Sequence, residues 1–261
     1  MAYERITLDV ADGVALLTLN DPGVFNAMGE AMLNEIGDAL DRIETADGGV
    51  RALVITGAGK AFCAGANLQE RGSGKARPVG MVLESHYHPL LRRLRHLPCP
   101  IATAVNGAAA GGGMSWALMG DIVLAARSAY FLQAFRRIGL APDVGSTWLL
   151  PRRIGIARAM ELSLLGEKLP AEKALEWGLI NRVCDDAALM DEAMTLARDL
   201  ARGPTRALGL IRRLYWDSAE NTFEDQLDLE FRTQRIAGAT DDYREGVTAF
   251  LEKRPARFTG H

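Results

Sequence analysis

Apolar and polar residues alternate along the start of the chain and then change to helical spacing. The alternation covers residues 6–10 and 14–19, on either side of Asp12-Gly13, a pair that favours a two-residue turn. This pattern predicts a β-hairpin. Residues 28–43 then carry apolar side chains three and four positions apart, which predicts a helix with one buried face.

Short apolar runs and one longer helical pattern fill the middle of the chain. A helix is predicted over 81–97, where Pro98 and Pro100 end it. The apolar runs predict buried strands at 51–56, 101–105, 121–126 and 130–132.

Two stretches between these elements have no clear period. Residues 57–80 are rich in glycine, alanine and charge and predict a loop, with 71–75 as its mobile part. Residues 107–113 are glycine and alanine only and predict a loop that opens a helix through Leu118.

From Pro142 onward the pattern is almost wholly helical, with breaks predicted at Pro151, Pro170 and Pro204. A strand-rich first half with interleaved helices followed by helices alone predicts an α/β fold with a helical C-terminal extension. We therefore expect a core over residues 1–200 and a helical region over 201–261.

The net charge, the apolar runs and the cysteine content argue against several classes of protein. A net charge of −3 disfavours a nucleic-acid partner, which would require a basic face. No apolar run approaches the ~20 residues that cross a bilayer, and the first residues lack the apolar core of a signal peptide. Three scattered cysteines do not make a disulfide framework. These features predict a cytoplasmic protein that does not bind a membrane.

Two motifs that suggest other chemistry are incomplete. Gly57-Ala-Gly59-Lys60 lacks the second spacing and the Ser or Thr of a phosphate-binding loop. His86 and His88 have no nearby Cys, Asp or Glu to complete a metal site, and on a helix they point in different directions. We expect no bound metal.

Two glycine-rich segments carry the best candidate chemistry, namely 62–68 and 106–113. Each follows a predicted strand, and the second opens a helix, whose first N–H groups have no partner within the helix. Small side chains let a ligand oxygen approach such groups. Two N–H groups meeting at one point would form an oxyanion hole, although tight packing between strand and helix explains either segment alone equally well.

These segments resemble the crotonase, or enoyl-CoA hydratase/isomerase, superfamily, and the similarity extends over nearly the whole chain. The matching blocks run from Gly57 to Leu68, from Val105 to Gly113 with Gly120-Asp121, from Gly139 to Pro142 with Gly145-Ser146-Thr147, from Glu176 to Leu179, and from Phe250 to Arg254. The resemblance implies a crotonase-like spiral of ββα turns and a helical C-terminal trimerisation region. It also implies an acyl-coenzyme A thioester as substrate, with no separate cofactor.

The resemblance further implies which residues meet this ligand. The backbone N–H groups of Ala66 and Gly112 would hold the thioester oxygen. The family's usual Asp after the Ala is here Asn67, which leaves the backbone donor in place. The acyl-CoA would also contact Asn26, Ala27, Ala64, Asn67, Leu68, Phe135 and Leu140, with Phe250 and Lys253 beside the coenzyme A of a neighbouring subunit in a homotrimer or dimer of trimers.

Hydratases of the family use two glutamates, at positions that hold Ser115 and Phe135 here. Between residues 101 and 150 the only carboxylates are Asp121 and Asp143, so two-carboxylate addition of water lacks its groups. Asp143 follows Pro142, and two interpretations are open. Apolar neighbours would make it a usable base for a carbon acid, whereas a position before a helix would make it an N-cap.

The blocks at Ala134-Phe135, Gly139 to Asp143 and Trp148 to Arg152 resemble the ring-epoxide isomerase branch, whose members also act as Δ3–Δ2 enoyl-CoA isomerases. This implies a one-base proton shuttle by Asp143 across an enolate. Three alternatives remain: an enoyl-CoA hydratase, an aryl-CoA dehalogenase that uses Asp143 and His88, and a non-catalytic member that binds acyl-CoA or RNA. Residues 71–80 and the helix from Met81 are expected to shape the acyl pocket.

Overall fold

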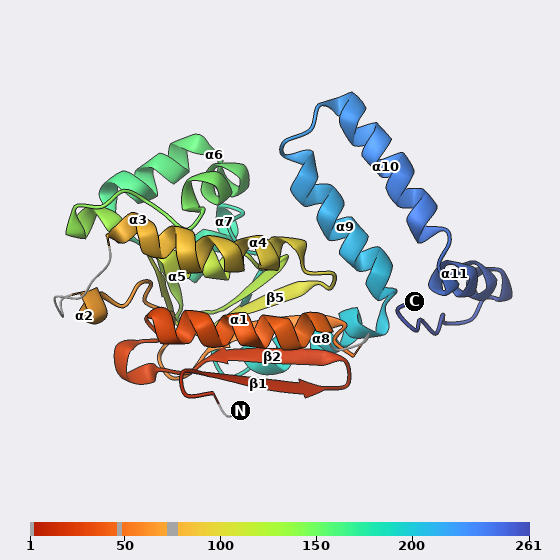
Figure 1. Ribbon diagram of the computed structural model, residues 1–261, viewed down its shortest axis with the longest axis horizontal. Helices are drawn as coiled ribbons and strands as arrows, with labels where there is room; N and C mark the ends of the chain where they lie inside the picture. The colour runs from red at the N-terminus through yellow and green to blue at the C-terminus, as the bar shows by residue number, and fades with distance from the viewer. Residues whose placement is uncertain (1–2, 46–48, 72–77) are drawn as a thin grey trace.

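The computed structural model describes residues 3–45, 49–71 and 78–261 (Figure 1). Its strands form two sheets, of which the larger has the order β1-β2-β3-β5-β7-β10 and the smaller β4-β6-β8-β9. The strands are β1 Ile6–Ala11, β2 Val14–Leu19, β3 Ala52–Gly57, β4 Ala61–Cys63, β5 Ile101–Val105, β6 Ala108–Ala110, β7 Ile122–Ala126, β8 Tyr130–Leu132, β9 Lys168–Pro170 and β10 Arg182–Cys184.

The chain passes repeatedly from a strand of the larger sheet to a short strand of the smaller sheet and then into a helix. This sequence occurs as β3-β4, β5-β6 and β7-β8, each followed by helix, and it confirms the predicted spiral of ββα turns. The helices are α1 Glu30–Thr45, α2 Leu68–Arg71, α3 Val79–Val82, α4 His88–His96, α5 Gly112–Ala117, α6 Ser146–Leu165, α7 Ala171–Glu176, α8 Leu189–Arg202, α9 Thr205–Ser218, α10 Phe223–Ala237 and α11 Asp241–Glu252.

The larger sheet is parallel except at its first pair. β1 and β2 form the predicted antiparallel hairpin, with Val10 opposite Ala15, and β2, β3, β5, β7 and β10 then run parallel. Strands buried on both faces need continuous apolar sequence, and β3 and β5 are buried at every position. Helix α8 packs on β3, β5 and β7, while α1 packs against β1, β2 and α4.

The sequence-based prediction is correct for the three-residue strand β8 but wrong for the other three-residue strands that the structure describes. The predicted loop at 57–80 contains β4, the predicted loop at 107–113 contains β6, and the region after Pro142, predicted as helical, contains β9 and β10. Runs of three residues are too short to show a period, and they are strands because neighbouring backbone pairs with them. Of the predicted mobile part at 71–75, residues 72–75 lie outside the described residues.

The predicted break at Pro151 is also displaced. Pro151 lies inside α6, and the helical path is interrupted instead at Gly155, where φ is 77° and ψ is 160°. Glycine tolerates this left-handed conformation at low cost, so the chain bends there. Pro170 and Pro204 do mark breaks, because they precede the first turns of α7 and α9.

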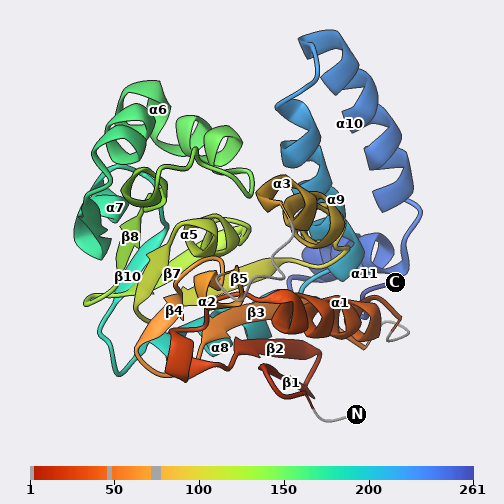
Figure 2. The same cartoon turned by 60° about the vertical axis from the view of Figure 1, so that its left-hand side comes forward.

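The C-terminal helices lie beside the core. In Figures 1 and 2, α9 and α10 form an antiparallel pair at one side, and α11 lies beyond them. Trp216 on α9 stacks on Trp148 of α6, with ring centroids 5.4 Å apart. Within the described part of the chain, no helix has the length and apolar character to span a bilayer.

Candidate active site

The two glycine-rich segments meet in space, and their backbones are in contact. A Cβ atom on Gly113 would lie 2.3 Å from the carbonyl oxygen of Cys63, and one on Gly107 would lie 2.2 Å from that of Lys60. Gly65 has φ +94°, and a Cβ there would lie 2.8 Å from the carbonyl oxygen of Ala110. Only glycine permits such an approach, so these residues hold the start of α5 against the segment after β4.

Ala66 forms a single parallel β-bridge with Met28, and its own N–H group points away from Met28. Met28 pairs with Ala66, with the Met28 N–H donating to Gly65 O at 2.7 Å and the Asn67 N–H donating to Met28 O at 3.0 Å. In a parallel pairing the residue between these two bonds directs its own N–H to the opposite side. Ala66 therefore offers a donor on the side away from Met28.

Gly112 supplies the second donor. It is the first residue of α5, where N–H groups lack partners within the helix, and its nitrogen lies 3.3 Å from the position of a Cβ on Gly65. Within residues 3–45, 49–71 and 78–261, the N–H groups of Ala66 and Gly112 donate to no backbone carbonyl. The predicted pair of donors is thus close together, as an oxyanion hole requires.

Ala66 and Gly112 line one cavity of about 230 Å³. Its wall comes from the segment after β4, from the turn before α4, from the start of α5, and from the stretch between β8 and α6. The wall residues are Ala64, Gly65, Ala66, Leu68, Leu83, Tyr87, Gly111, Gly112, Ala134, Phe135, Arg137, Ile138, Leu140, Asp143 and Val144. Among these described residues, Asp143 is the only carboxylate, and the wall is mostly apolar.

Asp143 lies next to the glycine donor. Its Oδ1 is 4.0 Å from the position of a Cβ on Gly112. The N-cap of α6 is Gly145, not Asp143, so the structure does not support the capping interpretation. Ser146 is fully buried, and its N–H and Oγ–H donate to the carbonyl oxygen of Asp143 at 3.0 and 2.6 Å. The backbone of Asp143 is therefore held from one side by the first residue of α6.

The two positions at which the family resemblance predicts the glutamates of a hydratase have no acidic group here. Phe135 is 7% exposed, and its ring edge lies 3.8 Å from the position of a Cβ on Gly111, so it covers the glycine segment. Ser115 is fully buried, outside the cavity wall, and its hydroxyl has no hydrogen-bond partner within the described part of the chain. A water molecule in this cavity would meet one carboxylate rather than two.

The remaining predicted contact residues divide into two groups. Ala64, Leu68 and Leu140 line the cavity, whereas Asn26 and Ala27 do not. The Asn26 side chain is fully buried, donates to Ala58 O and Ala61 O at 2.9 and 2.8 Å, and accepts from the Asp21 N–H at 2.9 Å. Asn26 therefore supports the backbone just before the first glycine-rich segment.

Asn67 also lies outside the wall. Its Oδ1 accepts from the Gln69 N–H at 3.1 Å at the start of α2. Asparagine and aspartate cap helices about equally well, so the departure from the family's Asp preserves this contact. Phe250 and Lys253 lie on and after α11, and neither reaches this cavity within the same chain.

Sequence reasoning missed a π-helical turn at Leu83–Tyr87, which joins α3 to α4. Leu83 and Tyr87 begin and end this turn, and both line the cavity. The Tyr87 hydroxyl donates to Met28 O at 3.1 Å, the oxygen that also accepts from Asn67. Widened turns of this kind occur often at functional sites, but no sequence period reveals them.

His88 directly follows this turn and does not line the cavity. His88 therefore does not share with Asp143 the wall of this cavity, where the dehalogenase interpretation requires both. Among the described side chains, no group of three His, Cys, Asp or Glu residues could hold a metal ion.

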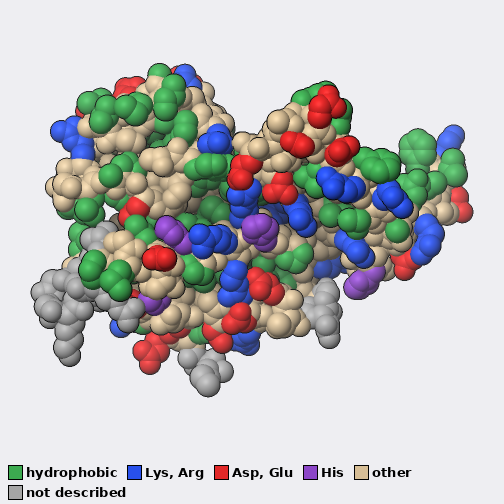
Figure 3. Space-filling model, turned by 45° about the horizontal axis from the view of Figure 1, so that its top comes forward, with side chains coloured by type: hydrophobic (Ala, Val, Ile, Leu, Met, Phe, Trp, Pro, Cys, Tyr) green, Lys and Arg blue, Asp and Glu red, His purple; other side chains and the backbone are tan. Residues whose placement is uncertain are grey.

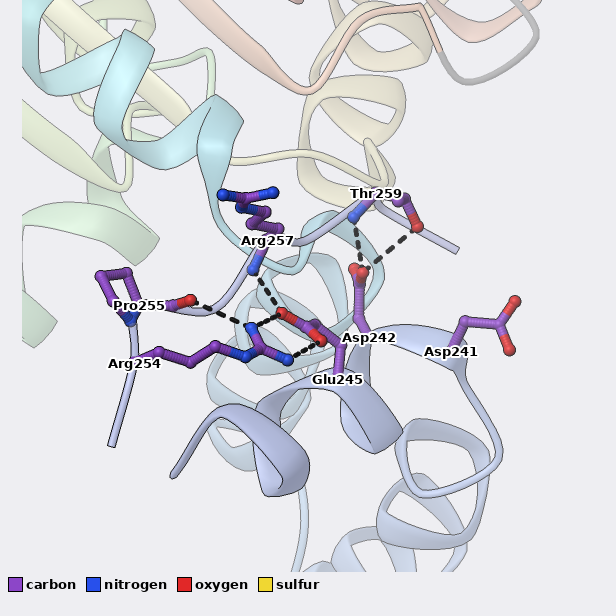
Figure 4. Close-up of a pocket in the computed structure, with 7 residues that line it drawn as sticks. All are labelled: Asp241, Asp242, Glu245, Arg254, Pro255, Arg257 and Thr259. Carbon is purple, nitrogen blue, oxygen red and sulfur yellow. Dashed lines mark hydrogen bonds and ion pairs between the residues drawn. The ribbon is translucent and has the colours of Figure 1, made fainter. Parts of the chain in front are cut away.

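A larger hollow of about 480 Å³ lies in the C-terminal region (Figure 4). Glu245 accepts from both terminal nitrogens of Arg254 at 2.6 and 2.8 Å and from the Arg257 N–H at 2.7 Å. The Arg254 guanidinium lowers the pKa of Glu245 to about 2. Asp242 accepts from the Thr259 and Gly260 N–H groups, so these acids hold the last residues against α11.

Comparison with known proteins agrees with this geometry. The enoyl-CoA hydratase/isomerase family matches residues 9–261. The chain is 51% identical over 260 residues to 1,2-epoxyphenylacetyl-CoA isomerase of Escherichia coli (strain K12), covering 98% of this chain and 99% of that protein. It is 45% identical over 262 residues to a protein of Rhodobacter capsulatus named "Probable enoyl-CoA hydratase", covering 100% of both.

Among solved structures, enoyl-CoA hydratase from Bacillus anthracis superposes with a TM-score of 0.92 at 31% identity, covering 99% of this chain and 100% of that one. Sequence, fold and the paired glycine segments therefore agree. The chain belongs to the enoyl-CoA hydratase/isomerase, or crotonase, family.

Proposed function

We propose that this protein is an acyl-CoA isomerase that uses Asp143 as its single acid and base. The observation that carries the proposal is the placement of one carboxylate, Asp143, beside Gly112 in a mostly apolar wall that also contains Arg137. Phe135 and Ser115 occupy the positions where a hydratase has its glutamates. The similarity to an isomerase at 51% identity supports the same choice.

In the proposed reaction the thioester oxygen accepts hydrogen bonds from the N–H groups of Ala66 and Gly112. The Asp143 carboxylate removes a proton from the carbon next to the thioester, and the electron pair of that C–H bond forms an enolate. The two N–H groups stabilise the negative charge on its oxygen. Protonated Asp143 then returns the proton to the γ-carbon, which moves the double bond from position 3 to position 2.

The size of the cavity suits a compact acyl group. An engineered cavity of ~150 Å³ holds benzene, so about 230 Å³ accommodates a six-membered ring with its epoxide oxygen. We therefore propose that ring-epoxide and short 3-enoyl thioesters are substrates. No cofactor takes part in this reaction, because the proton and the electron pair both remain in the substrate and in Asp143.

We also propose a cytoplasmic trimer or dimer of trimers. Figure 3 shows apolar side chains on the surface of the C-terminal region. The exposed ones on its helices include Tyr215, Phe223, Phe231, Phe250 and Leu251. Phe250 is 82% exposed, which is costly for a free surface and reasonable for a subunit interface. In this arrangement Phe250 and Lys253 would reach the coenzyme A of a neighbouring subunit. A monomer in sedimentation equilibrium would contradict it.

The experiment that tests the function is Asp143→Asn, with Asp9→Asn at an exposed position of β1 as a control for lost charge. Asparagine keeps the size of the side chain and cannot accept a proton near neutral pH. We expect the wild type and Asp9→Asn to convert 3-enoyl-CoA to 2-enoyl-CoA and to exchange an α-proton with deuterated water. Asp143→Asn should do neither, with unchanged binding of acyl-CoA.

Efficient hydration of crotonyl-CoA by both the wild type and Asp143→Asn would show that the proposed isomerase function is wrong. It would favour a hydratase in which another group activates water.

A further inference from the structure

The residue after Asp143 has an unusual backbone conformation. Val144 has φ 52°, in the left-handed region that favours glycine. Among the described residues, the other non-glycine residues with positive φ are Asp12, Phe25, Asn26 and Lys253, and none of them is β-branched. A β-branched residue is the least suited to this conformation, so surrounding contacts must maintain it.

The surroundings of Val144 supply such contacts. Val144 is 3% exposed, and its Cγ2 lies 3.2 Å from the position of a Cβ on Gly112. Ser146, two residues after Val144, donates two hydrogen bonds to the carbonyl oxygen of Asp143, the residue before it. Gly145, between Val144 and Ser146, is also left-handed, with φ 79°. The short turn from Asp143 to Ser146 is therefore fixed at both ends.

This conformation determines which side chains meet α5. The Val144 methyl and the Asp143 carboxylate both approach the same point, the position that a Cβ would take on Gly112, at 3.2 and 4.0 Å. Consecutive side chains in an extended segment would point to opposite sides. The left-handed residue brings both to one side, and the valine methyl occupies the space above Gly112 into which the carboxylate could otherwise turn.

We propose that Val144 is a positioning residue that fixes the Asp143 carboxylate relative to the oxyanion donor at Gly112. The inference rests on the proposed function, because it concerns the placement of the proposed base. The strained conformation is maintained by packing on Gly112 and by the bonds from Ser146, and it limits the carboxylate to one approach to the substrate.

The test compares two substitutions at this site with one elsewhere. Val144→Gly accepts the left-handed backbone without strain and removes the packing, so the carboxylate gains freedom. Val144→Thr keeps the β-branched shape. Asp12→Gly is the matched control, because Asp12 is also left-handed, at φ 53°, and lies in the exposed hairpin turn between β1 and β2.

We expect Val144→Gly to lower kcat by about 10- to 100-fold, as small displacements of a catalytic group do, with KM within threefold of the wild type. The exchange of the α-proton should fall by the same factor. Val144→Thr should restore kcat to within about fivefold, and Asp12→Gly should leave kcat and KM unchanged. A merely structural role would lower the melting temperature and the active fraction, and would leave kcat per folded enzyme as in the wild type.

A folded Val144→Gly enzyme with the kcat of the wild type overturns the inference, and so does a change confined to KM. If Val144→Gly does not fold, Val144→Ala, which removes the Cγ atoms and keeps Cβ, is judged by the same criterion. Failure of the proposed function gives a different result, since the wild type itself would then lack isomerase activity.

Discussion

Arg212 on α9 forms a buried ion pair with Asp121, the residue just before β7. Arg212 is 6% exposed, and its guanidinium also donates to the carbonyl oxygens of Leu97 and Leu94. Asp121 in turn accepts from the Ile101 N–H at 2.7 Å. This pair joins the C-terminal helices to the sheet, so the position of α9 depends on a charge buried at the starts of β5 and β7.

Replacing Arg212 with Met should destabilise the protein strongly. Removing one partner of a buried pair leaves an uncompensated charge and typically costs about 3–5 kcal/mol. Urea denaturation measures the effect, and Arg213→Met, at an exposed position on the same helix, is the control. Equal stability of the two variants would show that the buried pair does not hold α9.

The same variant should respond to pH in a defined direction. Burial raises the pKa of Asp121, and Arg212 opposes that rise, so Arg212→Met raises this pKa further. A folded state that binds the proton more tightly than the unfolded state loses stability as pH rises. The deficit of Arg212→Met should therefore be smaller near pH 5 than near pH 8. A deficit that grows on acidification would contradict this account.

Substituting Gly112 tests the oxyanion hole. Gly112→Pro removes one N–H group at the first position of a helix, where proline is tolerated. Loss of one such donor lowers turnover by about 10²–10³, or ~3–4 kcal/mol. Gly112→Ala keeps the N–H group, and Val144 Cγ2, 3.2 Å from the added methyl, has to shift by only a few tenths of an ångström, so turnover should fall much less. Steady-state kinetics of the two folded variants measures the difference in turnover. Equal turnover in both would show that the Gly112 N–H group takes no part in the reaction.

Ser115→Ala should be neutral or slightly stabilising. A buried hydroxyl without a partner costs about 1–3 kcal/mol, and alanine removes it while leaving only a small change in volume. We expect a melting temperature at or above that of the wild type and unchanged isomerase activity. A large loss of activity at normal stability would instead assign Ser115 a role in the reaction.

Glu245→Gln should change the acid sensitivity of the C-terminal region. The pKa of Glu245 is lowered from 4.5 to about 2, chiefly by Arg254, so its ionised form favours the folded state. That contribution is present in full above about pH 4.5 and is lost as pH falls toward 2. The difference in melting temperature between wild type and Glu245→Gln should shrink over this range. Glu230→Gln, at an exposed position of α10, should show no such trend.

Elements with a clear period were predictable, and elements fixed by tertiary contact were not. The hairpin and the strand at 101–105 were predicted within a residue, because alternation and apolar runs report burial directly. The strands β4, β6, β9 and β10 depend on pairing between distant segments, which leaves no local signal in three residues.

The candidate site divides in the same way. Ala66, Gly112 and Asp143 were predicted from the glycine-rich segments and the family resemblance, and they line one cavity. Tyr87 and Val144 were missed, because a π-helical turn and a left-handed valine result from the folded backbone. The family resemblance implied that Asn26 contacts the ligand, whereas its side chain bonds to backbone groups just before the first glycine-rich segment.

The close contact between the two glycine segments has a consequence for how this family diverges. At Gly107 and Gly113 even a methyl group would overlap a carbonyl oxygen, so these positions should tolerate no residue other than glycine. The cavity wall at Leu83, Phe135 and Leu140 contains ordinary side chains on separate elements, which can change one at a time. Heritable variation in substrate range should therefore accumulate in the wall, while the paired glycine segments are inherited nearly unchanged.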